Sequence, residues 1–227
     1  MREEYDFSKM KSRHNPYAAR LKSGMSDAKE HWASVYGSKP ADRVSWFQPR
    51  LANSLKMIAQ MELASGRVID VGGGASTLVD DLLERGFEVG VLDISADALR
   101  VARGRLGKNA AKVRWIEADI TQAELPAGCY DIWHDRALFH FLTDPADRKR
   151  YLAALRKALK PDGHVLIAAF SPSGPEQCSG LDVIRYSPDK LGKELGAGFK
   201  LVSSLEEAHR TPGGVVQNFV YCHFSRG

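Results

Sequence analysis

The chain has 227 residues, a net charge of +4, and 26% charged and 44% hydrophobic residues. A chain of this length suits one domain with a sizeable core, since folding buries about 70% or more of its unfolded surface. Residues 1–24 carry +3 of the net charge, so the charge of the rest gives no indication of nucleic-acid binding. The sequence has no apolar run of about 18 residues to span a membrane, and no signal-peptide pattern. We therefore expect a cytoplasmic protein that binds neither nucleic acid nor membrane.

The N-terminal residues 1–24 are polar and show no amphipathic period, which predicts a flexible extension of a domain spanning residues 25–227. The amino-acid sequence of residues 1–24 resembles the leader of some bacterial antitoxin proteins. The alternative is that these residues are an extension ahead of a native start at Met25. A helix is predicted from Ala28 to about Tyr36. A loop containing Trp46 follows, and then a helix from about Leu51 to Ala64.

Residues 67–93 form the most informative segment of the chain. A short apolar strand, Arg67 to Ile69, leads into Asp70 and a glycine turn at residues 72–74, followed by an amphipathic helix and a second strand that ends at Asp93. Glycines allow a ligand to approach the backbone closely. An acid at the end of the second strand is placed to accept hydrogen bonds from a ribose diol. The segment therefore predicts a nucleotide-cofactor site.

The turn fits a dinucleotide such as NAD poorly. The NAD fingerprint needs glycine at its sixth position, where this chain has Thr77, and Asp70 would repel a diphosphate but attract an ammonium group. A third strand, Val113 to Ala118, ends in Asp119, which could accept a hydrogen bond from an exocyclic adenine amine. These acids favour a cationic, amino-acid-bearing nucleoside.

Further elements alternate between helix and strand. Ser95 caps a helix that runs to Leu106. Near the C-terminus, the pattern predicts a helix from Ser187 or Asp189 to Leu195, and strands at 199–206 and 215–224 joined by a turn at 212–214. Three cysteines without CxxC spacing predict neither a disulfide framework nor a metal site.

Three acids at the ends of three successive strands, with glycines after the first, resemble the class I S-adenosylmethionine-dependent methyltransferases. Asp70, Gly72 and Gly74 match the first family motif, in which Ser76 replaces the last glycine. The resemblance covers roughly residues 30–224. It implies a fourth strand at 130–135, a helix from about Pro145 to Leu159, a stop at 160–163 and a strand at 164–170. It implies a doubly wound α/β fold, Rossmann-like, with a mostly parallel seven-stranded sheet and an antiparallel C-terminal hairpin.

The resemblance also implies a cofactor, S-adenosyl-L-methionine, its product S-adenosyl-L-homocysteine, and the residues that bind them. The expected cofactor-binding residues are Asp70, Gly72, Gly73, Gly74, Asp93, Ile94, Asp119, Ile120 and Trp46. Residues 28–48 correspond to an N-terminal lid that folds over the cofactor. Its aromatic rings either exclude water and face the sulfonium cation or simply pack on the core.

Methyl transfer needs collinear alignment above all, and a base only where the acceptor carries a proton that must leave. Candidate catalytic residues lie at the end of the fourth strand and just after it: His134, Asp135 and His140. His140 lies in an apolar run, which favours a buried structural histidine, and Asp135 could equally cap a helix or pair with Arg136. Candidate substrate-binding residues are Tyr36, Cys178, Arg185, Tyr186 and His209. A buried small hydrophobe is the alternative role of Cys178.

The short insertions around the core favour a small-molecule acceptor. Two alternatives remain from the sequence: protein-lysine methylation, because the aromatic lid resembles that of some protein-lysine enzymes, and a cofactor-binding regulatory module without turnover. DNA adenine methylation is disfavoured because residues 134–137 do not match the pattern of those enzymes. The acceptor and the oligomeric state are not indicated.

Overall fold

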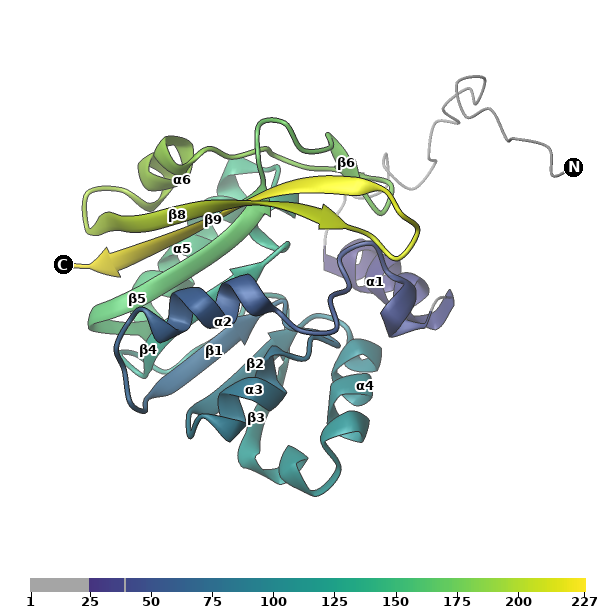
Figure 1. Ribbon diagram of the computed structural model, residues 1–227, viewed down its shortest axis with the longest axis horizontal. Helices are drawn as coiled ribbons and strands as arrows, with labels where there is room; N and C mark the ends of the chain where they lie inside the picture. Colours follow the sequence, from purple (N-terminus) through teal and green to yellow (C-terminus); the bar gives the residue numbers. More distant parts are fainter. Residues whose placement is uncertain (1–24, 39) are drawn as a thin grey trace, which may run out of the picture.

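The computed structural model describes residues 25–38 and 40–227, and the predicted N-terminal extension 1–24 lies outside them. A seven-stranded sheet runs through the centre in the order β3-β2-β1-β4-β5-β9-β8 (Figure 1). β1 to β5 are parallel, and β9 pairs antiparallel with both β5 and β8. The expected doubly wound sheet with an antiparallel C-terminal hairpin is confirmed.

The strands span Arg67–Val71 (β1), Glu88–Asp93 (β2), Val113–Glu117 (β3), Tyr130–Arg136 (β4), Leu159–Phe170 (β5), Phe199–Arg210 (β8) and Val216–Arg226 (β9). The helices span Met25–Ser38 (α1), Ala52–Ala59 (α2), Leu78–Glu84 (α3), Ala96–Leu106 (α4), Pro145–Ala158 (α5) and Pro188–Leu195 (α6). Short 3-10 turns lie at Ala41–Arg43, Gly107–Lys112 and Phe139–Phe141. Within these described residues, no helix is both long and apolar enough to cross a bilayer.

Two hydrophobic clusters hold the helices against the sheet. Leu55 of α2, Leu78 of α3 and Leu99 of α4 belong to the cluster on one face. Tyr151 of α5 and Leu191 of α6 belong to the cluster on the other. Successive strand residues point to opposite faces, so the central strands contribute to both clusters. Helix α1 lies beyond the carboxyl ends of the parallel strands (Figure 1), where ligands bind in open α/β sheets.

Most predicted boundaries differ from the structure by only a few residues, but three features differ more. Helix α2 ends at Ala59, short of the expected Ala64, and Glu62 then takes a positive φ of 55°. The expected stop at residues 160–163 lies within β5, because Leu159 already pairs with Tyr130 before the register shifts and His164 pairs with Ile132. A two-stranded hairpin, Gln177–Cys178 (β6) with Leu181–Asp182 (β7), was not predicted.

Candidate functional site

The three acids predicted to bind the cofactor lie on three neighbouring strands. Asp70 is the fourth residue of β1, Asp93 is the last residue of β2, and Asp119 follows the end of β3. These residues and the glycine turn 72–74 are called the cofactor edge below. A cavity of about 950 Å³ runs along this edge and is lined by Gly72, Asp93, Ile94, Asp119, Ile120 and Trp46, among others. A smaller cavity of about 40 Å³ reaches Asp70 and Gly73.

The glycine turn is shaped by close packing. Gly72 has a φ of +70°, and a Cβ built there would lie 2.6 Å from the side chain of Leu138. A Cβ on Gly73 would lie 2.5 Å from an oxygen of Asp70. Side chains are therefore excluded, and the backbone is open to a ligand. Ser76, the departure from the family pattern, accepts a hydrogen bond from the Leu78 N–H at 3.1 Å and so helps to cap α3.

Asp93 is a buried acceptor. Its Oδ1 accepts the backbone N–H of Ser95 at 2.8 Å. Burial raises the pKa of Asp93 to about 7, and the charge of Asp70 adds to the rise, although backbone N–H groups oppose it. Asp119 Oδ1 accepts both the N–H and the hydroxyl of Thr121 at 2.8 Å. Both carboxyls are thus oriented before any ligand binds.

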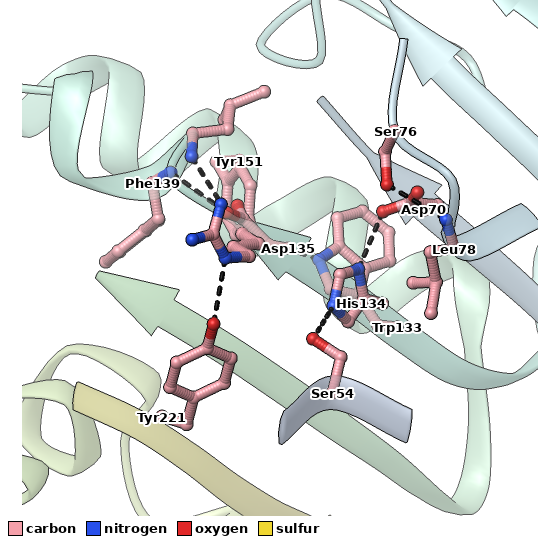
Figure 2. Close-up of polar contacts among 12 residues, drawn as sticks. Ser54, Asp70, Ser76, Leu78, Trp133, His134, Asp135, Phe139, Tyr151 and Tyr221 are labelled. Atoms are coloured by element: carbon pink, nitrogen blue, oxygen red, sulfur yellow. Dashed lines mark hydrogen bonds and ion pairs between the residues drawn. The ribbon is translucent and has the colours of Figure 1, made fainter. Parts of the chain in front are cut away.

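Asp70 belongs to a buried chain of three polar groups that joins α2, β4 and β1. His134 Nδ1 lies 2.6 Å from Asp70 Oδ1, and His134 Nε2 lies 2.9 Å from the hydroxyl of Ser54 on α2. Figure 2 shows the imidazole between these two partners. Both ring nitrogens of His134 are therefore engaged, so its role here is to hold Asp70 in place.

Asp135, the next residue of β4, points to the opposite face of the sheet (Figure 2). Its Oδ2 accepts the hydroxyl of Tyr151 at 2.7 Å, and its Oδ1 accepts the N–H groups of Leu138 and Phe139 at 3.0 and 3.3 Å. Burial raises the pKa of Asp135 to about 6. The side chain lies outside both cavities and braces the turn after β4, in line with the capping alternative.

His140 is fully buried among Phe141, Phe170 and Phe219. Its Nδ1 lies 3.3 Å from the Phe170 N–H, and burial lowers the pKa of the imidazole to about 3. His140 is therefore a neutral, enclosed imidazole, as expected for the buried structural histidine that its apolar sequence surroundings favoured.

Aromatic rings of residues 28–48, the predicted lid, line the large cavity. Trp46 packs edge-on against Trp32 and Tyr36, and Trp32 packs edge-on against Phe141. Trp46 and Tyr36 line both cavities. A Cβ on Gly74 would lie 3.0 Å from the Tyr36 hydroxyl and 3.0 Å from Asp93 Oδ2, so Tyr36 reaches the cofactor edge. The sequence had instead suggested Tyr36 as a substrate-binding residue.

Arg136 and its partners form a second polar group, which we call the acceptor wall: Arg136, Tyr221, Glu207, Gln48 and His209. Arg136 donates to the Tyr221 hydroxyl and to the Trp46 carbonyl, both at 2.8 Å. Tyr221 and Gln48 donate to Glu207 at 2.7 and 2.8 Å. His209 lies 3.2 Å from Gln48 and 2.7 Å from the Ser45 carbonyl. The hairpin β8–β9 and Arg136 thereby hold residues 45–48 of the predicted lid, which we call the lid loop.

The acceptor wall was largely missed from sequence. His209 was a candidate, but it contacts the lid loop rather than either cavity, and burial lowers its pKa. Arg136 lines both cavities and was named only as a partner for Asp135. A charged residue that ends an apolar strand at the ligand-binding edge is the signal that could have found it.

The other predicted substrate residues lie around the site. Cys178 is buried with Sγ 3.8 Å from the Ser45 hydroxyl, behind the lid loop. Cys222 belongs to the hydrophobic cluster on the other face of the sheet, so the two thiols do not meet. Arg185 binds the carbonyls of Pro172 and Gly174, and Tyr186 is buried in the core. The structure does not bring these residues together in one pocket.

Residues 68–163 match the family model described as a methyltransferase domain. The chain is 31% identical over 124 residues to a ubiquinone biosynthesis O-methyltransferase of Vibrio parahaemolyticus, a match that covers 52% of each protein. It is 33% identical over 112 residues to an uncharacterized methyltransferase of Mycobacterium tuberculosis, which covers 49% of this chain and 54% of the relative. The chain thus spans about half the length of the curated relatives it matches.

Two solved structures share the fold across nearly the whole chain. A protein whose structure is described as showing conversion of a disulfide bond into a thioacetal group during echinomycin biosynthesis superposes with a TM-score of 0.71 at 22% identity, over 88% of this chain and 92% of that one. The 1,6-didemethyltoxoflavin-N1-methyltransferase of Burkholderia thailandensis was solved with 1,6-didemethyltoxoflavin and S-adenosylhomocysteine. It superposes with a TM-score of 0.64 at 21% identity, over 96% of this chain and 92% of that one.

Proposed function

We propose that this chain, whose residues 68–163 match the methyltransferase-domain family model, transfers a methyl group from S-adenosylmethionine to a small-molecule acceptor. One observation carries the proposal: Asp70, Asp93 and Asp119 lie in order along three neighbouring strands, beside a turn that excludes side chains. The cytoplasmic location remains a prediction from the sequence.

The residues of the cofactor edge fit this cofactor. Asp70, held by His134, offers a carboxylate to the ammonium group of the amino-acid moiety. Asp93 and Asp119 offer acceptors to the ribose diol and to the adenine amine. Ile94 and Ile120 line the same cavity and supply apolar surface for the adenine ring.

The sulfonium of S-adenosylmethionine supplies a methyl group that is already activated. The chain's own task is therefore to align an acceptor and to exclude water, and good alignment is worth up to about 7–11 kcal/mol. The apolar wall of the large cavity includes three aromatic rings, those of Trp32, Trp46 and Phe141. Among the described residues lining it there is no histidine, cysteine or lysine. The ionisable side chains that do line it are aspartates, arginines and Tyr36, so an acceptor that must lose a proton would depend on a carboxylate as its base, whereas an acceptor that binds already ionised needs none.

The cofactor assignment is tested by calorimetry with S-adenosylmethionine, S-adenosylhomocysteine and NAD. We expect the two sulfur nucleosides to bind and NAD not to bind, because of Asp70 and Thr77 beside the turn. Tight NAD binding without a response to either sulfur nucleoside would overturn the proposal.

The acceptor class is tested by radiolabelled methyl transfer in a cell lysate, separated into protein and small-molecule fractions. We expect label in the small-molecule fraction. Label in the protein fraction would support the protein-lysine alternative, and cofactor binding without any transfer would support a regulatory module.

A further inference from the structure

Arg136 occupies the place where the two cavities meet. It is the last residue of β4, it lines both cavities, and it is only 9% exposed. Three other residues also line both cavities: Gly72, Tyr36 and Trp46. A cofactor that lies along the glycine turn would therefore have this guanidinium beside it.

The guanidinium is fixed on one side and unsatisfied on the other. Nε and Nη1 donate to Tyr221 and to the Trp46 carbonyl, and the cation lies 4.7 Å from the ring centre of Phe219. Nη2 is buried, makes no hydrogen bond among the described residues, and lies 3.8 Å from Glu207 Oε2. A buried charged donor without an acceptor is costly, and an anionic ligand would remove that cost.

The neighbouring acids do not meet this need. Glu207 already accepts hydrogen bonds from Tyr221 and Gln48, and 3.8 Å is too long for a bond to Nη2. Asp182 lines the large cavity but is exposed and accepts a bond from Gln177. The buried Asp93 and Asp70 belong to the cofactor edge.

The walls near Arg136 are aromatic and apolar. Trp32, Trp46 and Phe141 line the large cavity together with Leu138 and Leu181. Aromatic rings of this kind stack on planar ligands. A volume of about 950 Å³ lies near the upper end of the range of about 300–1,000 Å³ for small-molecule sites, so it leaves room for a second ligand beside a nucleoside cofactor.

We infer that Arg136 binds an anionic oxygen of a planar aromatic acceptor, with the ring of the acceptor lying against the wall that Trp32, Trp46 and Phe141 form. The inference rests on the proposed function and adds an acceptor class to it. It gives Arg136 a role in binding beyond its role as a tie between the lid loop and β9. The same carboxylate chemistry is present in the amino-acid part of the cofactor, so the experiment separates these two sources.

The experiment measures the binding of matched probes to the full chain saturated with S-adenosylhomocysteine, using calorimetry. The probes are benzoate against benzamide and indole-3-carboxylate against indole-3-carboxamide, which differ in charge and hardly in shape. We expect the parent to prefer the acids by about tenfold or more, the scale of a charge-assisted hydrogen bond. Arg136→Gln should abolish this preference, and Arg136→Lys should restore part of it.

Arg150→Gln is the matched control, because Arg150 lines the same cavity and the substitution changes the net charge equally. It should keep the preference for acids. A merely structural role of Arg136 would lower the affinity for acid and amide alike, and that result, or an unchanged preference in Arg136→Gln, would overturn the inference. A parent that binds acid and amide equally would overturn it as well.

A second measurement tells whether Arg136 binds the acceptor or the carboxylate of the cofactor. It compares affinity for S-adenosylhomocysteine with affinity for 5′-methylthioadenosine, which lacks that carboxylate. We expect Arg136→Gln to change neither affinity by more than about threefold, well below the loss of a charge-assisted bond. A selective fall for S-adenosylhomocysteine would instead assign Arg136 to the cofactor carboxylate and overturn the inference. If the parent binds neither nucleoside, the proposed function itself fails.

Discussion

The cofactor edge and the acceptor wall are built in different ways, although Gly72 of the first and Arg136 of the second line the same two cavities. The cofactor edge comes largely from one continuous segment and depends on backbone shape: a turn at residues 72–74 that tolerates no Cβ, with acids on adjacent strands. The acceptor wall joins β4, β8, β9 and the lid loop through side-chain hydrogen bonds. A site shaped by the backbone tolerates few substitutions. A site made of side-chain hydrogen bonds can change the ligand that it binds through single substitutions.

The largest effect on cofactor binding is expected from Gly72→Ala. The new Cβ would lie 2.6 Å from Leu138 at a φ of +70°, so packing and backbone strain should together lower the free energy of unfolding by about 2–4 kcal/mol. Affinity for S-adenosylhomocysteine should fall by about 100-fold or more as the turn shifts. Chemical denaturation and calorimetry measure the two effects.

Gly104→Ala is the control for that variant. Gly104 lies in α4, and a Cβ added there would meet nothing within 4 Å, so alanine should stabilise the helix by about 0.5–1 kcal/mol and leave affinity unchanged. If Gly72→Ala behaved like Gly104→Ala, the turn would not depend on its backbone shape.

The second effect concerns Asp93. Asp93→Ala should weaken S-adenosylhomocysteine binding by about 1.5–3 kcal/mol, the range for hydrogen bonds to a charged group, and leave folding intact. Parental affinity in this variant would exclude Asp93 as the ribose acid.

The same residue predicts a pH dependence. Burial raises the pKa of Asp93 to about 7, so the ionised acceptor and with it the cofactor affinity should be lost as pH falls through that value. Unfolding exposes a carboxyl of ordinary pKa, so the folded state binds the extra proton between about pH 4 and 7, and the Asp93 contribution to stability decreases as pH rises through this window. Asp93→Asn should flatten both profiles, measured by titration calorimetry and denaturation.

The smallest effect on cofactor affinity is expected from Trp46→Ala, which acts on the lid. Turnover should fall by about tenfold or more, because poor alignment of reacting groups is costly. The free energy of unfolding should fall by only about 1–2 kcal/mol. Saturating S-adenosylhomocysteine should also protect residues 28–48 of the parent from proteolysis. Identical digestion with and without it, together with parental turnover in the variant, would make these rings ordinary core.

The local sequence is sufficient to predict the cofactor edge but not the acceptor wall. The glycine turn and the strand-end acids follow a repeated strand-helix-strand pattern, so their positions at one edge of the sheet follow from spacing, while their roles in cofactor binding stay a prediction. The meeting of Arg136 with Tyr221, 85 residues away, depends on how β9 inserts beside β5. Adjacent residues were also misleading: His134 and Asp135 were both named as catalytic candidates, but the alternation of a strand sends their side chains to opposite faces.

That alternation at β4 has a consequence for local unfolding. Detaching α2 would leave His134 without Ser54, and detaching α5 would leave Asp135 without Tyr151, so either event exposes an unsatisfied buried group within the central sheet. The two helical layers are thereby coupled to one strand and should exchange their amide hydrogens together with it. The lid loop, tied mainly by side-chain bonds to its carbonyls and amides, can open at a much lower free energy. Ligand entry and product release can then proceed while the glycine turn and its acids keep their geometry.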